Sequence, residues 1–297
     1  MLMTPRITTA IAVSVAGLGL LAAACGRKND STPPVATPSV TLAHEKVPLG
    51  SPIDVTYKFV VANDARFDED YYVMVHVIDA DDQMIFDFDH APAVPTRQWK
   101  PGQTVEYTRT EFMPVFPYVG EATVQIGLYS PASKTRLTLA GENNGQHAYK
   151  VSKFQIQPQT ENILLTYKDG WNSTETAEHN PTIEWQWTKK NATLTFKNPK
   201  KDSVFYLDVD AAGGVFQEPQ AVAVTLGHAT VDQFSLQPKQ RELRKIKLTA
   251  AQLGNDDMAE LHIVVDKTFV PAQIAAANNK DPRELGVRVF HAFVDAH

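Results

Sequence analysis

The chain has 297 residues, of which 43% are hydrophobic and 21% are charged, a balance that suits two domains with buried cores and excludes disorder along most of its length. The formal net charge of −6 leaves no basic footprint, so nucleic acid is not an expected partner. The single cysteine, Cys25, excludes an intrachain disulfide and a cysteine-based zinc cluster.

The first 24 residues have the pattern of a secretory signal peptide. Arg6 supplies the positive charge, and residues 7–24 are uncharged, largely apolar and end in three alanines directly before Cys25. A run of about 18 such residues is also the lower limit for a membrane span. Two glycines weaken a helix in this run, however, and Cys25 falls where a processing peptidase cuts. We therefore predict that residues 1–24 are removed.

Residues 20–25, Leu-Leu-Ala-Ala-Ala-Cys, resemble the lipobox of bacterial lipoproteins. The leucine usual three places before the cysteine is Ala22 here, with Leu21 one step further out. The resemblance implies that Cys25 carries diacylglycerol and, after cleavage, an acylated amine, so that the membrane is a partner. Several acyl chains give stable anchoring where one does not. Gly26 is similar to the outer-membrane address of Gram-negative lipoproteins, which implies a position facing the periplasm.

Residues 25–38 contain three prolines and many polar side chains, which predicts a disordered tether. Strict alternation over 53–61 and 122–128 then indicates half-buried strands, and 71–78 reads as a central strand. A change of phase within 149–156 indicates a β-bulge. Strands separated by proline-containing turns predict that residues 39–157 form an immunoglobulin-like β-sandwich.

Residues 158–163 are mostly polar and include a proline, which predicts a short linker. Alternating segments resume after it, and their number predicts that residues 164–297 form a jelly-roll-like β-sandwich. The only helical segments expected are short, at 250–253 and 272–277. The predicted fold class is therefore all-β, with two β-sandwich domains.

Acidic residues gather at 64–70 and 79–89 and offer oxygen ligands suited to calcium. No EF-hand pattern accompanies them, so solvated loop carboxylates are the expected account, and calcium binding stays open. The nine histidines show no metal-binding spacing, and no nucleophile elbow, P-loop or dinucleotide fingerprint is present. We predict no catalytic residue, no metal site and no cofactor. Paired carboxylates of a hydrolase stay an alternative, because such pairs form only in the fold.

Tryptophans mark the second predicted domain. Trp171 follows Gly170 at a turn and is expected to be the most exposed, while Trp185 and Trp187 share one face of a strand. Exposed tryptophan faces stack on sugar rings, which makes these three residues candidates for ligand binding. Two same-face tryptophans also fill sandwich cores, so both interpretations stay open.

Two groups of motifs resemble a known module. Residues 169–171 (Asp-Gly-Trp) with Glu175 and 185–188 (Trp-Gln-Trp-Thr), and then 266–272 and 281–287 (Asp-Pro-Arg-Glu-Leu-Gly-Val), resemble a β-sandwich domain appended to bacterial polysaccharide and glycosyltransferase proteins. The resemblance implies a carbohydrate-binding-module-like jelly roll without known catalytic residues.

Arg283, within the closing motif, offers a planar fork to a carboxylate. We hypothesise that it pairs with Glu175 to close the second sandwich; an alternative has Arg283 facing a ligand. Gly286 is expected to permit an unusual backbone conformation.

These patterns predict a lipid-anchored, non-enzymatic envelope protein that binds glycan or a partner in the handling of cell-surface polysaccharide. The first alternative is an assembly or scaffold lipoprotein that binds envelope proteins through strand edges or loops. A hydrolase with unrecognised carboxylates is the second alternative.

Overall fold

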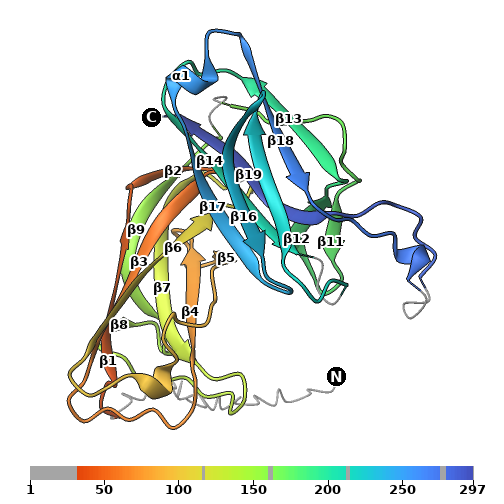
Figure 1. Cartoon of the computed structure of the whole chain (residues 1–297). Coiled ribbons are helices and arrows are strands. Elements are labelled where there is room, and N and C mark those ends of the chain that lie inside the picture. The colour runs from red at the N-terminus through yellow and green to blue at the C-terminus, as the bar shows by residue number, and fades with distance from the viewer. Residues whose placement is uncertain (1–31, 116–117, 160–162, 212–214, 275–278, 297) are drawn as a thin grey trace, which may run out of the picture.

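The computed structural model describes residues 32–115, 118–159, 163–211, 215–274 and 279–296. Almost every regular element is a strand, and antiparallel pairs dominate the sheets, which confirms the predicted all-β class and its β-sandwich domains (Figure 1). No helix in the described ranges is long and apolar enough to cross a membrane. The candidate signal peptide and Cys25 lie outside the described residues.

The first sandwich consists of residues 36–157. Its strands are β1 (Ala36–Leu42), β2 (Lys46–Pro48), β3 (Pro52–Val61), β4 (Tyr72–Ile78), β5 (Met84–Asp87), β6 (Thr104–Phe112), β7 (Gly120–Tyr129), β8 (Glu142–Asn143) and β9 (Tyr149–Gln157). One sheet has the order β1-β3-β6, and the other has the order β2-β9-β7-β4-β5 with β8 paired to β9. The inward side chains of both sheets form one core that includes Tyr57, Phe59 and Ile126.

β1 begins three residues before the expected domain boundary at residue 39. Ala36, Thr37 and Pro38 already pair with β3, and the Ala36 side chain is buried in the first core. Proline is tolerated here because β1 is an edge strand, whose outward N–H groups are not needed for pairing. The tether therefore ends earlier than its polar, proline-containing composition suggested.

The expected bulge in β9 is confirmed. Val124 pairs with Ser152 while Gln125 pairs with Lys150, so Val151 is the extra residue. The extra residue explains why the apolar pattern of this strand changes phase.

The second sandwich consists of residues 166–296. Its elements are β10 (Thr166–Tyr167), β11 (Glu175–Ala177), β12 (Asn180–Trp187), β13 (Asn191–Lys197), β14 (Ser203–Ala211), β15 (Gln220–Leu226), β16 (Ala229–Leu236), β17 (Arg241–Leu248), α1 (Ala250–Leu253), β18 (Met258–Val265) and β19 (Val287–Ala296). The sheets have the orders β10-β13-β18-β15-β16 and β11-β12-β19-β14-β17, with a second core between them.

The sequence predicted two short helical segments in this half, and the structure confirms one of them. The short helix at 250–253 is confirmed as α1, whose first turn is capped by Thr249. The segment expected to be helical at 272–277 is a single 3₁₀ turn, Pro271–Gln273, and residues 275–278 lie outside the described part.

Of the expected linker at 158–163, residues 160–162 also lie outside the described part, while Ile163 packs against the second core.

The two sandwiches meet at the ends of β3 and β6 (Figure 1). Lys245 Nζ of β17 lies 2.7 Å from Asp54 Oδ1 of β3. The ring of Phe112 in β6 stacks on His291 of β19 with 4.1 Å between centroids and 5° between planes. Ala36 pairs with Val61 at the other end of β3. The chain therefore enters the first sandwich at the end remote from the second.

Candidate functional site

One row of side chains crosses the outer face of the sheet β11-β12-β19-β14-β17. Trp187 of β12 lies opposite Arg288 of β19. Arg288 in turn lies opposite Asp210 of β14, and Asp210 lies opposite Arg241 of β17. Alternation along each strand explains the row, because the intervening Val209, Val287 and Val289 are buried in the second core. Charged and aromatic groups are therefore gathered on the face opposite the core. We call Trp185, Trp187, Arg241, Arg288 and Phe290 the arginine–aromatic face.

Trp185 and Trp187 lie on this outer face, half-buried, and neither is part of the second core. The guanidinium carbon of Arg288 lies 5.0 Å from the ring centroid of Trp185 and 5.7 Å from that of Trp187. These distances are those of cation–π contacts. Of the two interpretations left open by the sequence, core filling does not describe these tryptophans, whose rings adjoin an arginine instead.

Phe290 joins the two arginines. The register between β14 and β19 shifts between Asp208 and Val209, which leaves Phe290 as the extra residue of a bulge. The guanidinium carbon of Arg241 lies 3.8 Å from the Phe290 centroid, and that of Arg288 lies 5.3 Å from it. Its ring is also 5.9 Å from Trp185. The face is thus a continuous layer in which guanidinium groups lie over aromatic rings.

Buried aspartates hold both arginines in place. Arg241 Nε donates to Asp208 Oδ1 at 2.8 Å, and Arg288 Nε donates to Asp210 Oδ1 at 2.8 Å, with each Nη2 donating to the second oxygen. The aspartate side chains are 10% and 9% exposed, against 43% and 29% for their arginines. Burial raises the pKa of Asp208, but hydrogen bonds from Arg241 and His291 outweigh it and leave that pKa below its ordinary value. The carboxylates lie beneath, and the guanidinium groups form the outer layer.

Glu175 and Arg283 lie next to this face. Arg283 Nη1 is 2.7 Å from Glu175 Oε1, and its Nε and Nη2 donate to Asp281. Hydrogen bonds to these two carboxylates raise the pKa of Arg283 further above its ordinary value, with that to Asp281 the larger cause. The other oxygen of Glu175 accepts a hydrogen bond from Trp187 Nε1 at 3.3 Å. The pair therefore orients one tryptophan of the face.

Trp171 pairs with Thr188, the residue after Trp187, but its ring packs against the second core and is not part of the arginine–aromatic face. Its Nε1 donates to the carbonyl of Thr193 at 2.8 Å, and its ring packs against the second core and edge-on to Tyr167. Like the other two candidate tryptophans it is half-buried, so it does not stand out as the exposed one. Gly170, in the turn that precedes it, lies so close to Asn191 that a Cβ there would collide with the Asn191 carbonyl oxygen.

Acidic residues in the loops of the first sandwich make hydrogen bonds and ion pairs that stabilise those loops. Glu69 accepts a hydrogen bond from Ser130, Asp70 pairs with Arg97, and Asp79 accepts from backbone N–H groups of its own turn. Within the described ranges no group of three or more His, Cys, Asp or Glu side chains is arranged to hold a metal ion.

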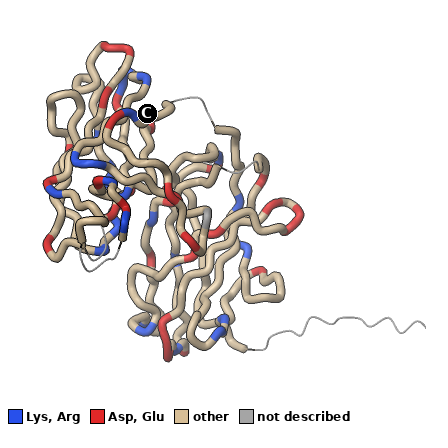
Figure 2. Tube along the Cα trace, turned by 90° about the vertical axis from the view of Figure 1, so that its right-hand side faces the viewer, with Lys and Arg blue, Asp and Glu red and all other residues tan. Residues whose placement is uncertain are grey.

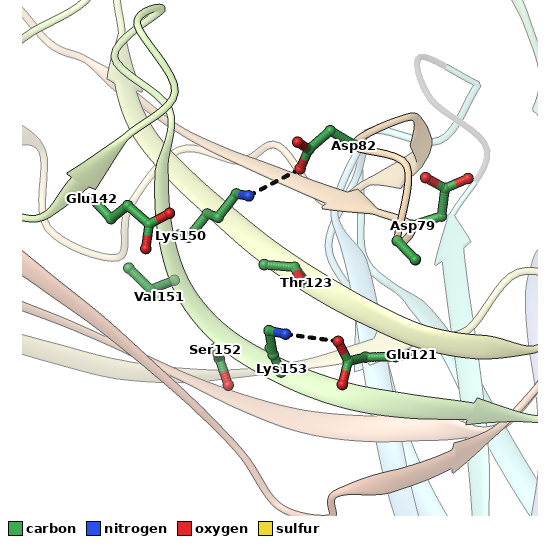
Figure 3. Close-up of a pocket in the computed structure, with 10 residues that line it drawn as sticks. Asp79, Asp82, Glu121, Thr123, Glu142, Lys150, Val151, Ser152 and Lys153 are labelled. Atoms are coloured by element: carbon green, nitrogen blue, oxygen red, sulfur yellow. Dashed lines mark hydrogen bonds and ion pairs between the residues drawn. The ribbon is translucent and has the colours of Figure 1, made fainter.

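A polar hollow of about 550 Å³ lies over β7 and β9 of the first sandwich (Figure 3). Lys150 pairs with Asp82 at 3.0 Å, and Lys153 pairs with Glu121 at 2.7 Å. No aromatic ring is among its described lining residues, so it offers no surface on which a sugar stacks. Basic and acidic residues are interspersed along both sandwiches (Figure 2), so charge alone singles out neither.

Sequence reasoning identified Trp185, Trp187, Glu175 and Arg283, which the structure brings together. It missed Arg241, Arg288, Phe290, Asp208 and Asp210. One local signal was present, since Asp208 and Asp210 alternate with apolar residues in β14 and so must share the outward face.

No protein-family model matches the chain, and no curated protein matches it. Three solved structures are similar to it over much of its length. The sporulation control protein Spo0M from Bacillus subtilis is 11% identical over 74% of this chain and 92% of its own, with a TM-score of 0.28. A family 43 arabinoxylan arabinofuranohydrolase from Bacillus subtilis, in complex with cellotetraose, is 10% identical over 88% of this chain and 54% of its own, with a TM-score of 0.27.

The third is a catalytic domain with two CBM51 domains from Clostridium perfringens ZmpB, 9% identical over 83% of this chain and 34% of its own, with a TM-score of 0.26. The chain thus spans about half of the arabinofuranohydrolase and about a third of the ZmpB structure.

Proposed function

We propose that this chain is a lipid-anchored, non-enzymatic protein of the bacterial cell envelope that binds glycan in the handling of cell-surface polysaccharide. Lipid on Cys25 holds it to the outer membrane, facing the periplasm, and the second sandwich binds the glycan. The single observation that carries the proposal is the arginine–aromatic face, where Trp185, Trp187 and Phe290 lie together outside the core.

The chemistry of this face suits sugars. Aromatic rings present a negative π-face to the C–H edges of a pyranose, and guanidinium N–H groups beside them donate to hydroxyl oxygens. Asp208 and Asp210 hold the guanidinium planes of Arg241 and Arg288 before ligand arrives. A preorganised surface loses less conformational entropy on binding, which favours affinity.

The state of Asp208 supports binding rather than proton transfer at this position. General acid catalysis of glycoside hydrolysis requires a carboxyl group with a raised pKa. On this face Asp208 and Asp210 are each bonded through both oxygens to an arginine, and the pKa of Asp208 is lowered. Asp208 is therefore not suited to deliver a proton.

The place where the chain enters the first sandwich, at Ala36 of β1, supports an anchored role. β3 has ten residues and so spans about 30 Å between the end that meets β1 at Ala36 and the end that meets the second sandwich. With Cys25 in the bilayer, the first sandwich acts as a spacer. The arginine–aromatic face is then held away from the lipid surface, where a polymer has access to it.

Calorimetric titration of the full mature chain, in detergent, against a panel of neutral and acidic bacterial polysaccharides tests the proposal. We expect binding to at least one polymer, and a loss of about fivefold in affinity for Trp187→Ala, because one stacked aromatic contributes about 1 kcal/mol. Trp99→Phe is the matched control, since Trp99 is buried in the first core.

Three outcomes decide the proposal. Equal affinity loss in the Trp187 variant and the Trp99 control overturns the assigned face. Absence of binding to every polymer, together with capture of an envelope protein, favours the scaffold alternative. Release of reducing sugar during the titration favours the hydrolase.

A further inference from the structure

Two arginine side chains on the arginine–aromatic face have a donor group that the fold does not use. Arg241 and Arg288 each give Nε and Nη2 to an aspartate. Their Nη1 groups make no hydrogen bond or ion pair with the described residues. Both guanidinium carbons lie over the ring of Phe290, at 3.8 and 5.3 Å, so the two unused donor groups belong to one small area.

The same two arginines are also the outer members of their ion pairs. Their side chains are several times more exposed than those of Asp208 and Asp210 beneath them. A ligand that approaches this face therefore meets these guanidinium groups before the carboxylates of Asp208 and Asp210. The buried Glu111 of β6 also lies within Coulombic range of Arg241. A carboxylate group is the natural partner for such donors, because charge-assisted N–H···O bonds are stronger than those to a hydroxyl oxygen.

We propose that the glycan bound on this face is acidic, and that carboxylate groups of its sugar units accept hydrogen bonds from Arg241 and Arg288 while the sugar rings stack on Trp185 and Trp187. This inference rests on the proposed function and adds the class of ligand. The buried aspartates neutralise the arginines, so recognition depends on hydrogen bonds at short range rather than on a strongly basic surface.

Each of three polymers, alginate, polygalacturonate and hyaluronate, is titrated into the full mature chain in its native form and after chemical reduction of its carboxyl groups to alcohols. We expect at least one native polymer to bind and its reduced form to bind at least tenfold more weakly, because the charged acceptor is lost. Dextran sulfate distinguishes carboxylate from anionic charge in general, and binding weaker than that of the native polymer is expected.

Arg288→Lys and Arg241→Lys keep the charge and remove the planar fork, so each is expected to weaken binding of the native polymer about tenfold and to weaken binding of the reduced polymer less, because only hydrogen bonds to hydroxyl groups are lost there. Arg97→Lys is the matched control. Arg97 also gives Nε and Nη2 to an aspartate, Asp70, but it lies in the first sandwich and no cation–π contact of its guanidinium with a ring is seen in the described chain. The Arg97→Lys variant is expected to bind the native and the reduced polymer with unchanged affinity.

The outcomes separate the two proposals. Equal binding of native and reduced polymers, with sensitivity to Trp187→Ala, overturns the acidic ligand and leaves glycan binding intact. Binding of neutral panel polymers alone has the same meaning. Binding of dextran sulfate as tight as that of the carboxylated polymers overturns carboxylate recognition. Absence of binding to any polymer overturns the proposed function together with this inference.

Discussion

Arg283 lies 2.7 Å from Glu175, which is also the hydrogen-bond acceptor of the Trp187 indole. Arg283→Ala removes two ion pairs, those with Glu175 and Asp281, and leaves Asp281 only the hydrogen bond from the backbone N–H of residue 283. Because both pairs are partly exposed, we expect a loss of about 1 kcal/mol and a fall of a few degrees in the Tm of the second sandwich. Calorimetry checks this, with Lys153→Ala, which breaks an exposed pair in the first sandwich, as the control. An unchanged Tm contradicts a structural role for Arg283.

Gly170 is expected to be intolerant of any side chain. It has a φ of 82°, and a Cβ placed on it lies 1.8 Å from the carbonyl oxygen of Asn191. Gly170→Ala therefore combines backbone strain with a collision against backbone, and we expect a loss of about 3 kcal/mol in urea unfolding. Gly145 also has positive φ but has nothing within 4 Å, so Gly145→Ala isolates the strain and costs about 1 kcal/mol. Equal losses contradict the close approach.

His90 is expected to make the first sandwich less stable in mild acid. Burial lowers the pKa of His90 from 6.5 to about 4. Between these values the unfolded chain binds a proton at His90 and the folded chain does not, so stability falls as the pH drops through this range. The loss approaches about 3 kcal/mol near pH 4.

The contacts of His90 agree with a neutral ring. Its Nδ1 lies 2.8 Å from the Phe88 carbonyl oxygen and therefore donates, while Nε2 accepts from the Tyr107 hydroxyl at 2.8 Å. Chemical unfolding of the wild type and of His90→Gln between pH 7 and 4 checks the prediction. The variant is expected to show a flatter pH dependence, and parallel curves contradict it.

Cys25 is expected to carry the lipid. In a bacterial host Cys25→Ser removes the acceptor thiol, so the variant is expected to incorporate no alkyne-labelled fatty acid and to keep its first 24 residues. Fatty-acid labelling and N-terminal mass spectrometry check this. Labelling of the variant at the wild-type level contradicts lipidation at Cys25.

Local patterns predicted the strands because one face of each is buried. The alternation at 53–61 follows from the burial of Tyr57 and Phe59, which needs no knowledge of partners. The same rule placed Trp185 and Trp187 on one face. It did not say which face, because this depends on pairing with β19, where Val287 and Val289 point inward.

Local sequence patterns could not predict contacts between residues that are far apart in the sequence. Arg288 and Asp210 are 78 positions apart, and nothing near either one indicates their pairing. Gly286 was expected to permit an unusual backbone, but its φ is not in the positive region. A Cβ there lies 2.5 Å from Thr188 Oγ1, so glycine is required for close packing instead.

The most direct test of glycan binding on the arginine–aromatic face uses fluorescence. The chain has four tryptophans, so Trp99→Phe/Trp171→Phe leaves only Trp185 and Trp187, both on the face. Titration of this variant with a polysaccharide that binds the wild type is expected to shift its emission with the wild-type affinity. The reciprocal variant, Trp185→Phe/Trp187→Phe, is expected to show no shift. A shift that follows Trp99 or Trp171 instead, with silent Trp185 and Trp187, contradicts the account.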